Sequence, residues 1–509
     1  MNILATIESR RLAVCLPLAL GLLGTRPTPA ADTIPDRGAG TDAAVVDTFR
    51  GRNGAVFTDW PKPRAVVVVT GELDGYIEPC GCTGKENQKG GLSRRQNFLR
   101  AIEAAGWPVM AVDLGGQVRR FGRQTEAKFQ SIADGLRAMR YAAVGLGPGD
   151  LRLPTEEIVA AVAPIGDQPT PFLSANVGLF GLDAGITPRF RVVPVGDLKI
   201  GVTSVIGDRE AAQIRNDTVV TKPAAAALGE VAGLLEKADC THRILLSAAQ
   251  PEETRALAAG QPGFDIVVTA GGADEPPLAP PTLPGGGRLI EVGHKGMFAV
   301  VIGFFADTET PVRVQRVPLD ARWGESEEMI KLLASYQNKL ETLGLKGLGI
   351  MPLRHPTGRR FAGSTACAEC HEEAYDVWKD TPHAQALTTL EKQSPRRDGD
   401  PECLSCHVVG WAAQRFEPFE GGFADMKTTP HLAHQGCENC HGPAAAHTAV
   451  ERGDVKATEA ERDRLRKDLV LTLATPEGKQ RAVNNCLECH DLDNSPKFDF
   501  DEYWPAVKH

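Results

Sequence analysis

The sequence reads Cys-Ala-Glu-Cys-His at residues 367–371, and the same Cys-x-x-Cys-His spacing recurs at residues 403–407, 437–441 and 486–490. Two thiols at this spacing can form thioethers to the two vinyl groups of one porphyrin, and the histidine that follows lies beneath the iron as its proximal ligand. A disulfide pair or a zinc ribbon would not need a histidine after every cysteine pair. The four motifs therefore predict four covalently bound haem c groups.

The motifs use eight of the twelve cysteines of the chain. The predicted thioether-forming residues are Cys367, Cys370, Cys403, Cys406, Cys437, Cys440, Cys486 and Cys489. The predicted proximal iron ligands are His371, His407, His441 and His490.

A sixth iron ligand decides whether a haem only carries electrons or also binds a small molecule. Nine of the twelve histidines lie after residue 360, so this part holds five histidines besides the four proximal ones. We expect His383, His434 and His447 to be distal ligands, with His431 and His509 as weaker alternates. Exposed surface histidines are the other interpretation, which the enrichment near the motifs disfavours.

Around the motifs the sequence resembles the cytochrome c-554 family of tetrahaem proteins, over about residues 360–509. The similar stretches are Trp378 with His383-Ala384-x-Ala386, Cys403 to Gly410, Gly436 to Pro443 with His447, and Cys486 to Asp491 with Ser495-Pro496-Lys497-Phe498-Asp499. The resemblance implies mostly bis-histidine haems, with room for one five-coordinate haem, and electron transfer between periplasmic redox enzymes. Which haem would be open does not follow from the sequence.

Upstream of the motifs, strand-like and helix-like stretches alternate. Residues 65–70, 109–113 and 199–206 are short apolar runs typical of buried strands, and residues 127–139 and 224–238 are typical of helices. Such alternation predicts an α/β fold of layered sheets flanked by helices over residues 63–318. After a connector helix and linker at residues 319–357, we expect a mainly α, loop-rich multihaem domain over residues 358–509.

Residues 63–318 resemble the 5′-nucleotidase branch of the calcineurin-like metallophosphoesterases. The similarity rests on Gly71-Glu72-Leu73-Asp74-Gly75, on Glu78-Pro79 and on Gly90-Gly91-Leu92-Ser93-Arg94. Where that family carries metal ligands, this chain has Gly116, Pro148, Gly149, Ala248 and Gly272. A two-metal centre needs carboxylate and imidazole ligands, so we expect a degenerate domain without phosphoesterase activity.

Five acidic residues remain near the expected cleft and could supply oxygen ligands to one hard cation such as Ca²⁺ or Mg²⁺. They are Glu72, Asp74, Asp113, Asp150 and Asp274. Solvated loop carboxylates are the simpler interpretation, and we favour it.

Cys80-Gly81-Cys82 lies in a loop at the same cleft. In an exported protein these thiols would form a disulfide, with Cys240 as one partner, or they would bind a soft metal or act as a redox pair. The nearby Lys85, Lys89, Arg94 and Arg95 would either attract an anion or form a solvated basic face.

The start of the sequence predicts export. Residues 1–31 contain Arg10 and Arg11, a short apolar run and small residues suited to cleavage, as in a signal peptide. An uncleaved N-terminal anchor is the alternative, and no stable membrane span is expected after cleavage. Residues 32–62 are rich in Asp, Gly, Pro and Arg and are expected to be a linker. The formal net charge of −9 argues against a nucleic-acid partner.

These observations favour an exported, periplasmic multihaem cytochrome that passes electrons to and from periplasmic redox proteins. The N-terminal domain would then serve for docking or ligand binding. One alternative is a redox enzyme acting on a small nitrogen or sulfur compound at a five-coordinate haem. Another is a metal-dependent hydrolase of the 5′-nucleotidase type, which the lost ligands disfavour.

Overall fold

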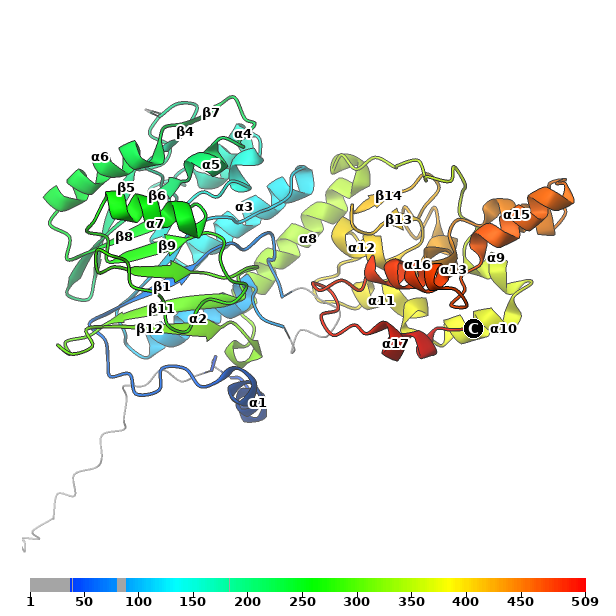
Figure 1. Ribbon diagram of the computed structural model, residues 1–509, viewed down its shortest axis with the longest axis horizontal. Helices are drawn as coiled ribbons and strands as arrows, with labels where there is room; N and C mark the ends of the chain where they lie inside the picture. The colour runs from blue at the N-terminus through cyan, green and yellow to red at the C-terminus, as the bar shows by residue number, and fades with distance from the viewer. Residues whose placement is uncertain (1–36, 39, 80–87, 183) are drawn as a thin grey trace, which may run out of the picture.

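The computed structural model describes residues 37–38, 40–79, 88–182 and 184–509. The expected signal peptide and the Cys80-Gly81-Cys82 motif with Lys85 lie outside these residues. Figure 1 shows an N-terminal part built from sheets and helices, a helical C-terminal part, and helix α8 (Glu327–Gly347) running between them. Within the described residues, no helix is both long enough and apolar enough to cross a bilayer.

Two five-stranded sheets form the centre of the N-terminal part, with strand orders β12-β11-β1-β2-β3 and β10-β9-β8-β6-β5. The strands of the first sheet are β1 (Ala65–Thr70), β2 (Val109–Asp113), β3 (Ala143–Val144), β11 (Phe298–Phe304) and β12 (Val312–Pro318). Those of the second are β5 (Phe190–Val195), β6 (Leu198–Ile206), β8 (His242–Ala248), β9 (Ile266–Thr269) and β10 (Arg288–Glu291). Strands β1, β2 and β3 run parallel, and β11 pairs antiparallel with β1.

The side chains of β1 show how the two sheets pack. Successive residues of a strand point to opposite faces, so Val67 and Val69 face the second sheet while Val66 and Val68 face helices. The core between the sheets joins Val67 to residues such as Ile244 and Val268 of β8 and β9. Both faces of β1 are buried, which explains its continuous apolar run.

Helices cover the outer faces of both sheets. Helices α2 (Leu92–Ala104) and α3 (Arg123–Ala138) pack on the first sheet, and α8 packs against these two helices. Helices α6 (Ala224–Lys237) and α7 (Pro251–Gly260) pack on the second sheet. The result is a four-layer α/β/β/α arrangement (Figure 1). The predicted α/β fold of layered sheets flanked by helices is confirmed.

Smaller elements complete this part. They are α1 (Ala43–Asn53), the 3₁₀ turns η2 (Asp150–Arg152) and η3 (Ala321–Trp323), α4 (Thr155–Val162), α5 (Asp208–Ala211), and the antiparallel pair β4 (Val177–Leu179) and β7 (Val219–Thr221). Helix α1 differs from the linker expected at residues 32–62. Its Val46 and Phe49 are buried, and Phe57 and Trp60 join the main core, because aromatic stacking against Phe98 and Trp107 holds this segment in place.

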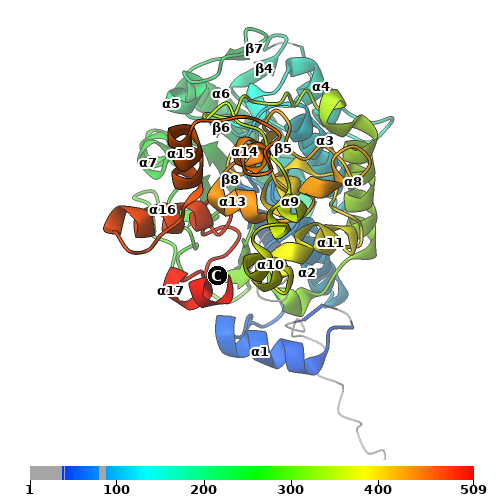
Figure 2. The same cartoon turned by 90° about the vertical axis from the view of Figure 1, so that its right-hand side faces the viewer.

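The C-terminal part is made of short helices and loops, as predicted. Its helices are α9 (Ser364–Ala368), α10 (Glu372–Lys379), α11 (Ala386–Glu391), α12 (Pro401–His407), α13 (Cys437–His441), α14 (Ala445–Glu451), α15 (Glu459–Leu469), α16 (Pro476–Leu487) and α17 (Phe500–Tyr503). Strands β13 (Trp411–Ala412) and β14 (Glu417–Pro418) and the 3₁₀ turns η4 (Pro382–Gln385), η5 (Pro430–Leu432) and η6 (Trp504–Ala506) complete it. Its apolar core is small and lies around Leu404, Val408 and Trp411. Figure 2 views this part end-on, with its helices in front of the N-terminal layers.

Candidate haem-binding site

Each Cys-x-x-Cys-His motif lies on or at the end of a short helix. The motif at residues 403–407 ends α12, the motif at 437–441 forms α13, and the motif at 486–490 follows from the last turn of α16. A helical turn places cysteines three positions apart on one face, so both thiols can point toward the same ligand. Asp400 begins α12 by accepting a hydrogen bond from the backbone N–H of Glu402 at 3.0 Å.

Three proximal histidines have a hydrogen-bond partner for Nδ1. His407 Nδ1 lies 2.6 Å from the Ala386 carbonyl, His441 Nδ1 lies 2.8 Å from the Leu469 carbonyl, and His490 Nδ1 lies 2.9 Å from the Ser495 hydroxyl. A carbonyl can only accept, so Nδ1 donates in the first two cases and Nε2 keeps its lone pair. Such a partner fixes the tautomer and the orientation of a metal-binding imidazole.

Three proximal histidines also face another histidine ring. The ring centroids are 6.5 Å apart for His371 and His447, 6.1 Å for His490 and His383, and 5.6 Å for His441 and His509. With metal–imidazole bonds of about 2.0 Å and about 1.1 Å from nitrogen to ring centroid, the ring centroids of two axial imidazoles stand roughly 6.2 Å apart. The three separations therefore fit one iron between each pair, and the residues present fit the haem groups.

Burial favours neutral imidazole at these positions. Loss of hydration lowers the pKa of several histidines of this part, and neutral imidazole is the form that binds iron. The affected residues are His383, His407, His434, His441, His447 and His490.

The structure places the predicted distal histidines in different surroundings. The structure brings His383, His447 and the weaker alternate His509 against proximal partners. His434 instead accepts a hydrogen bond at Nδ1 from the Leu387 backbone at 3.2 Å, and its φ of 69° is left-handed. His431 packs beside Gly363 and Glu438. Within the described part of the chain, no ring contact of the paired kind involves His407.

The four motifs contact one another through their cysteines. The thiol of Cys367 lies beside that of Cys437, and the thiol of Cys406 lies beside that of Cys489. Cys440 lies close enough to Cys486 for an electrostatic interaction. With the motifs numbered in chain order, the first therefore lies beside the third, the third beside the fourth, and the fourth beside the second.

Glu438 holds the third motif to the segment before the first. Its buried carboxylate accepts hydrogen bonds from the backbone N–H groups of Ala362, Gly363 and Ala444 at 2.7–3.0 Å. Burial raises the pKa of this carboxyl, and these donors oppose the rise. Sequence reasoning missed this residue, because its partners are backbone groups distant in the chain.

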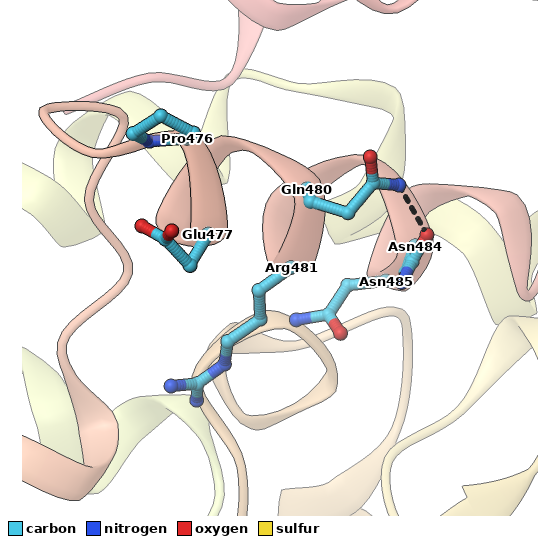
Figure 3. A pocket seen from close by; sticks show the side chains of 6 residues that line it. All are labelled: Pro476, Glu477, Gln480, Arg481, Asn484 and Asn485. Carbon is cyan, nitrogen blue, oxygen red and sulfur yellow. Dashed lines mark hydrogen bonds between the residues drawn. The ribbon is translucent and has the colours of Figure 1, made fainter.

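An open pocket of about 620 Å³ lies along α16, beside the third motif. Figure 3 shows the side chains of Pro476, Glu477, Gln480, Arg481, Asn484 and Asn485 along it. Asn485 donates to the Cys440 carbonyl at 2.8 Å, and Arg481 donates to the Asp468 carbonyl at 3.2 Å. The pocket therefore lies next to Cys440 of the third motif.

In the N-terminal part, a buried ion pair occupies the centre of the expected metal cleft. Arg95 Nη1 lies 3.2 Å from the Asp113 carboxylate, and both side chains are 0% exposed. Asp113 also accepts hydrogen bonds from Thr70 at 2.6 Å and Gln117 at 2.6 Å. A guanidinium at this place repels a cation. Arg95 is therefore not part of a solvated basic face, as one expectation had it, but a buried partner of Asp113.

The other acidic residues of the cleft also have protein partners. Asp150 accepts backbone N–H groups of Gly116, Gly147 and Val118 at 2.8–3.0 Å, and Glu72 accepts that of Gly271 at 3.1 Å. Burial raises the pKa of both Glu72 and Asp150 to about 7. Asp274 is largely exposed and pairs with His294, 3.3 Å away. No three His, Cys, Asp or Glu residues of the described ranges are grouped so that they could hold a metal ion.

The C-terminal part is similar in sequence to known proteins. Residues 366–442 match the family model described as cytochrome c554 and c-prime. Cytochrome c-554 of Nitrosomonas europaea is 30% identical over 151 residues, which is 27% of this chain and 60% of that protein. The chain thus spans less than two thirds of this curated relative.

Solved structures similar to the chain have mixed α/β sheets with helices. Sulfate thiohydrolase SoxB of Thermus thermophilus has a TM-score of 0.47 at 13% identity, covering 56% of this chain and 62% of that one. A 5′-nucleotidase precursor, also of Thermus thermophilus, has a TM-score of 0.46 at 15% identity, covering 61% and 67%. The C-terminal part of this chain is therefore similar in sequence to the cytochrome c554 and c-prime family over residues 366–442.

Proposed function

We propose that this protein is an exported, periplasmic cytochrome that carries electrons through four covalently bound haem c groups. The four proximal ligands are His371, His407, His441 and His490, and the eight motif cysteines form the thioethers. The haems supply one-electron chemistry, and the chain sets their potentials through axial ligands and the groups hydrogen-bonded to them.

The observation that carries this proposal is the facing of histidine rings across iron-sized gaps. His447, His383 and His509 would be the distal ligands of the first, fourth and third haems. The contacts between motif cysteines support a haem order of first, third, fourth and second. Such an order gives electrons a continuous route between periplasmic redox partners at its two ends.

A haem-to-protein ratio tests this directly. The purified holoprotein should carry four covalent haems per chain, of which three give low-spin spectra with two axial imidazoles. Fewer than three covalent haems would refute the proposal. Replacing both cysteines of one motif, for example Cys403→Ala with Cys406→Ala, should remove one haem.

A second candidate function is the binding of a small molecule at the haem of the second motif. Among the described residues, His407 has no facing imidazole of the kind found at the other three, so its iron would keep an open position. A small nitrogen or sulfur compound would bind there. We expect one high-spin ferric haem per chain whose signal changes on adding nitrite, hydroxylamine or NO. A spectrum without that signal would leave electron transfer alone.

We propose that the N-terminal part has lost phosphoesterase activity. The support is the Arg95–Asp113 ion pair, which places a positive charge where a two-metal centre needs cations. Nucleotide hydrolysis with added Mn²⁺ or Ca²⁺ is expected to be absent. Hydrolysis that disappears in Asp113→Asn would contradict this proposal.

A further inference from the structure

The loop after the fourth motif contacts two loops of the N-terminal part. Asp493 accepts a hydrogen bond from the Tyr76 hydroxyl at 2.7 Å and forms an ion pair with Lys295. Tyr76 lies in the loop after β1, and Lys295 lies in the loop between β10 and β11. We call Tyr76, Lys295 and Asp493 the latch.

A backbone hydrogen bond links the latch to Glu72. The backbone N–H of Gly296, next to Lys295, donates to the Glu72 carbonyl at 3.2 Å. Glu72 and Lys295 have left-handed φ angles of 46° and 56°, which cost energy for residues with side chains. The packing of these loops therefore determines where the Tyr76 and Lys295 side chains lie.

On the haem side, the loop forms a tight turn that ends on the proximal ligand. The Asp491 carboxylate accepts the backbone N–H groups of Asp493 and Asn494 at 3.0 and 2.7 Å. The Ser495 backbone N–H donates to the Asp491 carbonyl at 2.8 Å. Ser495 is buried, and its hydroxyl lies 2.9 Å from His490 Nδ1.

The partner of His490 differs in kind from those of two other proximal histidines. His407 and His441 meet backbone carbonyls, whereas His490 meets a side chain carried by the loop that Asp493 anchors. When Nε2 binds iron, Nδ1 keeps its proton and donates to the Ser495 oxygen. This hydrogen bond makes the imidazole a stronger donor to iron, and outer-shell partners of this type tune redox potential.

We propose that the N-terminal part tunes the potential of the fourth haem through the latch. Tyr76 and Lys295 hold Asp493, and Asp493 holds the turn that presents Ser495 to His490. Ser495, Tyr76 and Lys295 are thus positioning residues. The inference rests on the proposed function, since it requires a haem bound at the motif of residues 486–490.

The test uses the full-length holoprotein and spectroelectrochemistry. Ser495→Ala removes the hydrogen bond to Nδ1, and Tyr76→Phe removes one latch contact without changing the charge. Tyr141→Phe is the matched control, because it removes a buried hydroxyl of the N-terminal part that contacts Thr70 rather than Asp493.

In Ser495→Ala and in Tyr76→Phe, we expect one haem to shift toward its reduced form. At a fixed applied potential its oxidised-to-reduced ratio should change roughly threefold, about 28 mV, since a tenfold change for one electron is 59 mV. The other haems and the Tyr141→Phe control should not change. In the double variant Tyr76→Phe with Ser495→Ala, the potential of that haem should shift no further than in Ser495→Ala alone.

Two results would overturn the inference. One is an unchanged haem potential in both Tyr76→Phe and Lys295→Met. The other is full additivity of the potential shifts of Tyr76→Phe and Ser495→Ala, which would exclude the route through Ser495. The covalent haem content of the wild type is measured first. Fewer than three haems would refute the proposed function itself, which separates that failure from a failure of the latch.

Discussion

Glu72 is a buried carboxyl group whose protonation links the stability of the fold to pH. Burial raises its pKa from 4.5 to about 7, and a backbone N–H of Gly271 is its partner. A carboxyl group with a raised pKa favours folding below its unfolded pKa and loses that contribution as pH rises through its folded pKa. The stability of the wild type should therefore fall between about pH 4.5 and pH 7.

Glu72→Gln should remove this loss. The amide cannot ionise, so the variant should gain stability relative to the wild type as pH rises. At about 1.4 kcal/mol per pKa unit, the gain in unfolding free energy should reach roughly 3 kcal/mol above pH 7. Thermal unfolding at pH 5 and pH 8 measures the difference. Equal effects of Glu72→Gln at both pH values would contradict the assignment.

Glu438 has a structural role that a second substitution can isolate. Glu438→Ala leaves the buried N–H groups of Ala362, Gly363 and Ala444 without a partner, at about 1–3 kcal/mol for each unsatisfied group. We expect a loss of at least about 3 kcal/mol in unfolding free energy and a lower haem content at the first and third motifs. Glu438→Gln retains one acceptor oxygen and should lose less. A stable Glu438→Ala variant with full haem content would show that the contacts matter little.

At the scale of elements, α17 and η6 place His509 against the third motif. Asp499 begins α17 by accepting the N–H groups of Asp501 and Glu502, which directs the following segment back toward His441. His509→Ala should therefore open the sixth position of the third haem. The high-spin ferric signal should grow by one haem per chain in electron paramagnetic resonance spectra. His431→Ala, which removes the alternate that packs beside Gly363 instead, should leave the spectrum as it was.

Helix α8 joins the two parts, and side-chain pairs also connect one part to the other. Gln337 of α8 donates to Asp400 at 3.0 Å, and Lys128 of α3 pairs with Glu402 at 2.6 Å. Both partners lie at the start of α12, which carries the second motif. The position of α12 therefore depends on the N-terminal part, as does that of the latch loop.

At the scale of the whole molecule, Arg397 and Glu78 connect the haem part to the loop after β1. Arg397 Nε and Nη2 lie 3.0 and 2.6 Å from Glu78 Oε2, and the Arg397 side chain is only 7% exposed. Arg397→Met should leave Glu78 without this charged donor and lower stability by about 2 kcal/mol. The midpoint of the first thermal transition reports the loss.

Arg396 offers a matched control for this prediction. It is the neighbouring residue, it pairs with Asp398, and its side chain is 63% exposed. Because exposed ion pairs contribute little, Arg396→Met should change stability by less than about 0.5 kcal/mol. Equal effects of the two substitutions would show that the Arg397 contact does not stabilise the assembly of the two parts.

The sequence by itself determined the haem chemistry and the fold class. Cysteine and histidine spacing is local, so the four motifs can be read without a structure, and the continuous apolar run of β1 predicts a strand buried on both faces. Tertiary structure decided which histidine rings lie together: His509 lies against His441, and His434 lies against the Leu387 backbone. Ring pairs of this kind join residues distant in the chain. Tertiary structure also decided that Arg95 neutralises Asp113 and that Ser495 lies on the latch loop. Hydrogen bonds to backbone groups distant in the chain, and contacts between the two parts, follow no local sequence pattern.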